Sequence, residues 1–252
     1  MLTTVRPARR RRLLSAAAAI ALVLTPATTA LTAAPADAAP APYRVKVDGA
    51  FNTRGLATYT TNGGRGISGK VFRSSDLSQV TPVGQQQLAQ LGVRSIIDLR
   101  SDPERAMRPD VAVPFAPLFV ADVMRLAPFS GYSNFPGMYQ TFVDNPGALV
   151  AWRAMVLKLT QTARAGGTTV INCTAGRDRS GWAMALILRL LDAPMETIEA
   201  DFQAQHDGVD VAWMRGAFQH ANALYGNWDN YVRVGLRLTP QDVHALRAAL
   251  LR

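Results

Sequence analysis

One short stretch, residues 168–191, limits the possible fold of this chain more than any other. It begins with the β-branched and apolar run 168–171, passes through a polar loop and ends in the apolar run 182–191. This pattern predicts a buried strand, a tight loop and a buried helix. A helix that starts directly after such a loop can aim backbone N–H groups and the positive end of its dipole at one anion. The stretch therefore favours an α/β fold with an anion site at the loop.

The loop carries a nucleophile and a cation at a fixed spacing. Cys173 and Arg179 are separated by five residues, and Ser180 follows. A free thiol, with a pKa of roughly 8.5, needs a helix N-terminus or nearby cations to become a thiolate at neutral pH. Five residues let the backbone wrap one tetrahedral anion, Gly176 allows a conformation that other residues avoid, and Arg179 can hold two oxygens bidentately. The loop therefore predicts a thiolate that attacks a phosphate group.

The first 38 residues are typical of a secretory signal peptide. Arg6 and the four arginines at 9–12 precede the apolar run 13–24, and a small-residue segment ends at Ala38, after which we expect cleavage. The apolar run is well short of the roughly 20 residues that span a bilayer, so we expect no stable membrane insertion after cleavage. The sequence thus predicts a secreted, extracellular protein, exported by either the Sec or the twin-arginine route.

Cysteine usage and charge narrow the function further. Cys173 is the only cysteine in the chain, so an internal disulfide is impossible although the expected compartment is oxidising. A lone thiol in such surroundings favours a chemical role over an inert filler. Loss of residues 1–38 removes five arginines and one aspartate, which lowers the formal net charge from +9 to +5. No block of Lys and Arg remains, so we expect no nucleic-acid partner.

Strand and helix patterns alternate along the rest of the chain. Residues 101–145 are the least regular segment, and the patterns after Arg179 are helical. We predict a flexible leader at 39–43 and one domain at 44–252, in which helices flank a central, mostly parallel sheet and the C-terminal portion is all helical. The expected strands lie at 44–51, 71–74, 93–99, 111–120 and 168–171, and the expected helices at 81–92, 146–165, 179–191, 195–205, 211–223, 228–234 and 240–251.

The loop resembles that of the cysteine-dependent tyrosine phosphatases, and above all a bacterial branch whose loop reads His-Cys-x-Ala-Gly-Lys-Asp-Arg-Thr-Gly. Residues 52–54, 72–74, 97–101 and 225–239 are similar to other landmarks of that branch, so the resemblance covers nearly all of the chain after the leader. It implies a phosphatase-type domain that acts on phosphotyrosine, other phosphoamino acids or phosphoinositides. It implies no cofactor and no metal.

The resemblance also implies roles for single residues. Cys173 forms a phosphocysteine intermediate, Arg179 binds the phosphate, and Asp178 protonates the leaving oxygen with Asp98 as a helper. A structural role is the alternative for both carboxylates, in which Asp178 holds Arg177 or Arg179 and Asp98 pairs with Arg100. The phosphate-binding set that the resemblance implies is Thr174, Ala175, Gly176, Arg177, Ser180 and, as a further candidate, Asp98.

Three positions depart from the branch. Asn172 replaces the histidine before the cysteine and alters how the loop stabilises the thiolate, Arg177 replaces a lysine, and Gly55 stands where an aspartate is common. These departures keep two other functions open: a rhodanese-like sulfurtransferase, which also places a cysteine in an anion-binding loop, and a non-catalytic phosphate-binding module. The sequence chooses neither among the phosphorylated substrates nor among oligomeric states. The three histidines, His206, His220 and His244, lack metal-ligand spacing.

Overall fold

The strands in the described part of this chain form one mixed sheet. The computed structural model describes residues 1–2, 41–127, 134–204 and 208–252, and the described residues from 41 onward belong to one compact unit. Within the described residues the strand order is β1-β2-β3-β6-β4-β5; β3, β6, β4 and β5 pair in parallel, and β1 and β2 add an antiparallel edge. The strands are β1 (Tyr43–Arg44), β2 (Arg54–Gly55), β3 (Val71–Ser74), β4 (Val93–Asp98), β5 (Leu118–Val120) and β6 (Thr168–Asn172).

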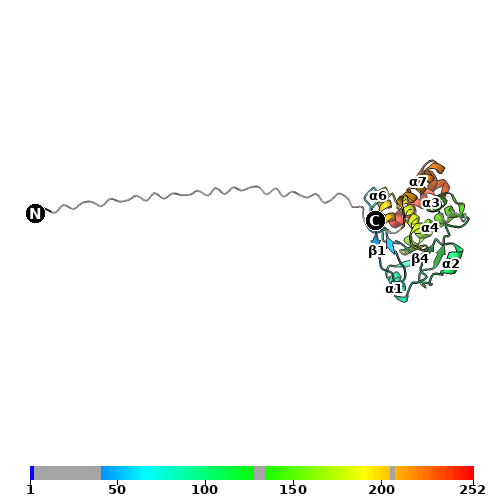
Figure 1. Ribbon diagram of the computed structural model, residues 1–252, viewed down its shortest axis with the longest axis horizontal. Helices are drawn as coiled ribbons and strands as arrows, with labels where there is room; N and C mark the ends of the chain where they lie inside the picture. The colour runs from blue at the N-terminus through cyan, green and yellow to red at the C-terminus, as the bar shows by residue number, and fades with distance from the viewer. Residues whose placement is uncertain (3–40, 128–133, 205–207) are drawn as a thin grey trace. The chain divides into compact units, whose positions relative to one another are not determined.

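Helices cover both faces of the sheet. Alternate residues of one strand point to opposite faces, so Ile171 joins the larger core with most of the helices, and Val170 joins a smaller core with Leu88 of α1. In Figure 1, α3, α4, α6 and α7 lie on one side of β4 and α1 lies on the other. The helices are α1 (Pro82–Gln90), α2 (Asp102–Met107), α3 (Phe135–Asp144), α4 (Pro146–Arg164), α5 (Asp178–Leu190), α6 (Met195–Gln203), α7 (Val211–Tyr225), α8 (Trp228–Asn230), the π-helical η2 (Tyr231–Gly235) and α9 (Pro240–Leu250).

This architecture confirms the predicted fold class. The sheet is mostly parallel, helices flank it, and the described residues after β6 are helical apart from their connections. The helix ends follow the expected chemistry, because Thr81 caps α1 through Gly84 N and Thr239 forms a capping box with Asp242 at α9.

Two predictions about local structure are wrong. The strand expected at 44–51 is replaced by the two-residue β1, because the chain turns at Gly49, whose φ is +80° and where a side-chain Cβ would lie 1.8 Å from the Gln79 carbonyl oxygen. In the segment 101–145, where the sequence predicts only a strand at 111–120, the strand is limited to β5 and the helices α2 and α3 are also present. Both helices have a proline in their first turn, where proline starts a helix rather than breaking it.

The topology places the polar ends of three strands at one edge of the sheet. The carboxyl ends of parallel strands meet at the same edge, which is where ligands bind in α/β sheets. Here Cys173 N donates to Ser74 O at the end of β3 (3.4 Å), and Leu99 N at the end of β4 donates to Asn172 O (3.0 Å). The residues at the ends of β3 and β4 therefore flank the segment that follows β6 and begins with Cys173.

The helices that the structure describes include none with the length and the apolar run needed to cross a bilayer. The predicted signal peptide, residues 1–38, lies outside the described residues except for its first two, and β1 begins at Tyr43, the last residue of the predicted leader.

Candidate active site

The Cys173 loop, residues 173–179, connects β6 to α5 by a tight turn. Cys173 is buried, with 2% of its surface exposed, and its Sγ lies 3.6 Å from Ser180 Oγ. Gly176 has a φ of +64°, and a Cβ at this position would lie 2.4 Å from the Ser74 carbonyl carbon. Only glycine fits such a backbone without strain. The predicted strand, loop and helix are thus present, and the serine hydroxyl can donate to the sulfur when it is a thiolate.

Arg179 is held by a carboxylate from a different part of the chain. Its Nη1 donates to Glu104 Oε2 (2.6 Å) and its Nη2 to Glu104 Oε1 (2.7 Å), while Nη2 also donates to Thr174 Oγ1 (3.1 Å). The Thr174 hydroxyl in turn donates to Glu104 Oε1 (2.6 Å). Bidentate pairing of this kind fixes the plane of the guanidinium. Glu104 therefore sets the orientation of the cation that the sequence predicts to hold phosphate.

Glu104 is a site residue that sequence reasoning missed, as are Tyr139, Asp110 and Asp201. It belongs to α2, where its carboxylate accepts from Ser101 N (2.9 Å) and closes a capping box with Ser101. Burial alone would raise the pKa of Glu104, but the hydrogen bond and charge of Arg179, with help from Thr174 and Ser101, outweigh burial and leave that pKa well below its usual range. The spacing Ser-x-x-Glu next to a proline was the available signal for this helix start.

We expect Glu104→Gln to lower kcat/KM by about tenfold, because the guanidinium loses its charge-assisted partner. Because folding lowers the pKa of Glu104, its carboxylate stabilises the folded protein at pH values above 4.5, the ordinary pKa of the group. This stability is lost progressively as the pH falls below 4.5. The Tm difference between wild type and variant should therefore be largest at neutral pH and should narrow near pH 3, at roughly one and a half units below that value. Thermal unfolding across this pH range measures it.

Glu196→Gln is the matched control, since Glu196 is exposed on α6. Its Tm should track wild type at every pH. A Tm gap for Glu104→Gln that stays constant from neutral pH to acid would contradict the role of the carboxylate.

A buried arginine donates hydrogen bonds to the backbone of the loop. Arg73 of β3 is fully buried, and its Nη2 donates to Gly176 O (3.1 Å) and Arg177 O (2.6 Å) while its Nη1 pairs with Asp201 (3.4 Å). Burial lowers the pKa of Arg73, and Asp201, followed by Cys173, opposes this change. Asn52 Nδ2 also donates to Gly176 O (2.7 Å). Two side chains that lie far away in the sequence, those of Arg73 and Asn52, thus hold the loop by hydrogen bonds to its carbonyl oxygens.

The Asn-x-Arg motif at 52–54 gains a structural explanation from these contacts. Arg54 is fully buried and donates to Asn52 Oδ1, so it holds the amide that contacts the loop. Burial, with the neighbouring Arg73 charge, lowers the pKa of Arg54 to about 9. Gly55 pairs with Phe72 in the sheet, and a Cβ on residue 55 would lie 2.8 Å from Val71 O. The close packing of β2 on β3 therefore favours glycine at this position, where an aspartate is common in the branch that the loop resembles.

Asp178 lies at the first turn of α5 with both carboxylate oxygens in use. Tyr139 OH donates to Oδ1 (3.2 Å) and Arg177 Nε to Oδ2 (3.2 Å). Burial raises the pKa of Tyr139 well above its ordinary value, and the Asp178 charge raises it further, so the phenol stays protonated and remains a donor. The contact with Arg177 is the one that the structural alternative for Asp178 anticipates. Both interpretations keep Asp178 at the loop.

Asp98 lies behind the loop in a buried network of charges. Its carboxylate accepts from Arg100 Nε (3.0 Å) and Nη2 (2.7 Å), and Arg100 Nη2 also pairs with Asp110 (2.7 Å). Asn172 Nδ2 donates to Asp110 Oδ2 (2.8 Å), which ties the residue before Cys173 to the same network. Desolvation raises the pKa of Asp110, and the charge of Asp98 adds to the rise. Asp98 therefore sits in the ion pair with Arg100 that the sequence offered as its alternative role.

The remaining predicted residues take different positions. Thr174 and Arg177 are half-buried in the loop, Ala175 is exposed at its turn, and Ser180 is buried. Among the described residues no group of His, Cys, Asp and Glu side chains is arranged to hold a metal ion. His220 pairs with Asp144 (2.9 Å), and His206 lies outside the described residues.

The sequence pattern of the tyrosine phosphatase family matches residues 45–252, so the chain belongs to that family. It is a phosphatase of the protein-tyrosine-phosphatase type, and its substrate is a phosphorylated molecule. Membership favours the phosphatase over the rhodanese-like sulfurtransferase. The family resemblance that the loop motifs predicted is confirmed.

The chain is similar in sequence to named phosphatases. The chain is 30% identical over 199 residues to the triple specificity protein phosphatase PtpB of Mycobacterium tuberculosis, an alignment that covers 65% of this chain and 70% of PtpB. It is 31% identical over 134 residues to a tyrosine-protein phosphatase of Nostoc commune, covering 50% of this chain and 45% of that protein. The crystal structure of P. aeruginosa TpbA shares 16% identity, with a TM-score of 0.39 over 84% of this chain and 96% of TpbA.

Proposed function

We propose that this protein is an exported phosphatase that hydrolyses phosphate monoesters through a phosphocysteine intermediate on Cys173. The observation that carries the proposal is the position of the thiol. It lies buried at the bottom of a loop whose rim holds Arg179 and whose following helix places Ser180 Oγ 3.6 Å from Sγ. A helix start, a hydroxyl donor and a guanidinium together stabilise a thiolate and an incoming phosphate.

The reaction has two steps. In the first, the thiolate attacks phosphorus, the S–P bond forms, and the bond from phosphorus to the leaving oxygen breaks as that oxygen takes a proton from Asp178. In the second, water attacks phosphorus, the S–P bond breaks, and the proton of the water returns to Asp178. Arg179, oriented by Glu104, and the amides of residues 174–179 hold the equatorial oxygens in both steps.

An acid quench during turnover tests the intermediate. Mass spectrometry of the digested protein should find one phosphate on the peptide that contains Cys173, and Cys173→Ser should lack it. Phosphate bound without turnover, and without this adduct, would instead identify the protein as the phosphate-binding module that remained open from the sequence.

Asp178→Asn should slow the first step in a way that depends on the leaving group. Phenyl phosphate releases a basic phenoxide, so the kcat of the variant for this ester should fall roughly a hundredfold. p-Nitrophenyl phosphate has a more acidic leaving group, so the kcat for that ester should fall less. The Tm should change little, because the amide of the variant can accept from Arg177 Nε through its oxygen and donate to Tyr139 OH through its nitrogen. Steady-state kinetics with the two esters makes the comparison.

Asp98→Asn is the matched control. It removes the carboxylate that accepts from both Nε and Nη2 of the buried Arg100, so we expect a clear loss of Tm and equal effects on both esters. A leaving-group dependence in Asp98→Asn and none in Asp178→Asn would exchange the roles of the two aspartates.

The substrates that we propose are phosphotyrosine and other phosphoamino acids, with phosphoinositides and small esters as further candidates. Membership of the tyrosine phosphatase family supports the first, and the name of the mycobacterial relative, a triple specificity phosphatase, supports a range wider than one phosphoamino acid. Phosphate release from matched phosphotyrosine, phosphoserine and phosphothreonine peptides, and from phosphoinositide vesicles, ranks them by kcat/KM.

Export is proposed from residues 1–38 alone, with cleavage after Ala38. Expression in a secreting bacterial host should release into the medium a protein whose N-terminal residue is Ala39. Full-length protein retained inside the cells would reject the proposal.

A further inference from the structure

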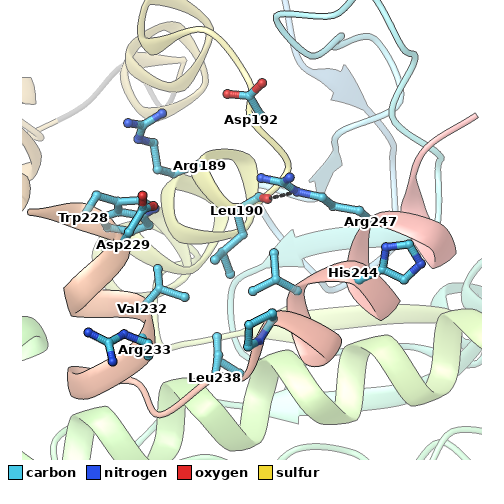
Figure 2. A pocket seen from close by; sticks show the side chains of 12 residues that line it. Arg189, Leu190, Asp192, Trp228, Asp229, Val232, Arg233, Leu238, His244 and Arg247 are labelled. Carbon is cyan, nitrogen blue, oxygen red and sulfur yellow. Dashed lines mark hydrogen bonds between the residues drawn. The ribbon is translucent and has the colours of Figure 1, made fainter.

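A cavity of about 540 Å³ lies at the end of α5 that is remote from the Cys173 loop. Its walls come from the end of α5, from the α8–η2 segment and from α9 (Figure 2). Arg189, which lines it, follows Arg179 by ten residues on one helix, and the rise per residue of an α-helix places the two roughly 15 Å apart. The volume falls within the range of small-molecule sites. The cavity is thus separate from the candidate active site and large enough for an organic ligand.

The floor of this cavity is apolar. Leu190, Val232 and Leu238 line it (Figure 2), and all three are buried. Trp228 forms part of the wall, where its ring packs against Tyr231 at a centroid distance of 5.3 Å. Trp228 and Val243 line the cavity and are only partly buried, so a ligand with an apolar body removes their remaining apolar surface from water.

The rim of the cavity carries three arginines, each oriented by a neutral partner. Arg247 Nε donates to Leu190 O (2.8 Å), and Arg233 Nη2 donates to Asn230 Oδ1 (3.1 Å). The guanidinium of Arg189 lies 5.8 Å from the centre of the Trp228 ring. Within residues 41–127, 134–204 and 208–252, none of these three guanidinium groups forms an ion pair with a carboxylate.

The acidic residues of the cavity do not balance these cations. Asp192 and Asp229 line it together with the three arginines, so the charged groups include three cations and two anions. Asp192 also accepts a hydrogen bond from Asn62 Nδ2 (3.0 Å), which directs one of its oxygens toward a neighbouring loop. The charge of the rim therefore favours an anion over a cation.

From the apolar floor and the cationic rim, we propose that this cavity binds a small organic anion with an apolar body, such as an aromatic sulfonate, carboxylate or phosphate. The site is independent of phosphate-ester chemistry at Cys173. Guanidinium groups hold the anionic head, and the leucine and valine side chains contact the body.

Fluorescence titration with anilinonaphthalene sulfonate tests the proposal, with orthovanadate added first to occupy the phosphate loop. The dye should bind with one-to-one stoichiometry in the presence of orthovanadate. Arg189→Gln and Arg233→Gln should each raise its Kd by about tenfold, as expected when one charged hydrogen-bond donor is lost. Neither arginine belongs to the catalytic machinery, so turnover of p-nitrophenyl phosphate should match wild type and report that both variants are folded.

Arg94→Gln is the matched control, because Arg94 is an exposed arginine of β4 that does not line the cavity. Its Kd for the dye should equal that of wild type. Displacement of the dye by orthovanadate, an absence of saturable binding, or an equal Kd in all three variants would each overturn the proposal.

Discussion

Cys173→Ser should abolish turnover of p-nitrophenyl phosphate, with kcat falling by at least about 10⁴-fold. A serine hydroxyl at the bottom of the loop remains protonated at neutral pH, because a helix start and nearby cations can bring a thiol to its anion but not an alcohol. The side chain is buried and the two residues differ by one atom, so the fold and the phosphate cradle should persist. Stopped assays of the purified variant measure the loss, and calorimetry with inorganic phosphate measures the binding that remains.

Ser180→Ala is the matched control for this result. It keeps the thiol and removes only the hydroxyl 3.6 Å from Sγ, so we expect a loss of about tenfold, the effect of one hydrogen bond to a charged atom. If Cys173→Ser keeps more than a hundredth of the wild-type kcat while Ser180→Ala falls as predicted, nucleophilic attack by Cys173 is wrong. If Cys173→Ser also loses phosphate binding and thermal stability, the thiol holds the loop together instead of attacking.

The parts of this molecule that could be predicted from sequence are those that local chemistry decides. Residues 168–191 contain a strand pattern, a loop with Gly176 at the point of closest approach and a helix pattern, and all three are present. The Thr-Pro helix starts at 81 and 239 are equally local. Such features depend on neighbours within a few residues, whose side chains and backbone preferences are written next to each other in the sequence.

The supports of the loop could not be predicted, because they depend on which strands pair. Glu104 reaches Arg179 only because β4 lies beside β6, so that the helix after β4 meets the loop after β6. In the sequence, Arg73 stands out only as part of a short motif. Its contacts with two loop carbonyls follow from the pairing of β3 with β6, which no local pattern specifies. The capping box at Ser101 could have indicated α2, but not the residue that Glu104 would bind.

Arg179→Lys should lower kcat/KM by about a thousandfold. Lysine keeps the charge but is a point donor, so it cannot give Glu104 the two parallel hydrogen bonds of 2.6 and 2.7 Å or present a planar fork to a phosphate. The loss should appear in kcat as well as in KM, because an arginine that follows the equatorial oxygens into the transition state stabilises that state more than the bound substrate. The inhibition constant of inorganic phosphate should rise in parallel.

Arg177→Lys makes the same chemical substitution two residues earlier in the same loop and introduces the lysine found in the bacterial branch that the loop resembles. Its guanidinium contacts Asp178 through Nε at 3.2 Å and is more exposed than that of Arg179, so we expect a change of less than about tenfold. The contrast between the two variants separates position from charge, since both retain a cation. Equally small changes in both variants would mean that net loop charge, and not the bidentate geometry set by Glu104, binds the phosphoryl group. A loss confined to Arg179→Lys, accompanied by a smaller loss in Glu104→Gln, would place the carboxylate and the guanidinium in one catalytic unit, with Glu104 acting through the orientation of Arg179.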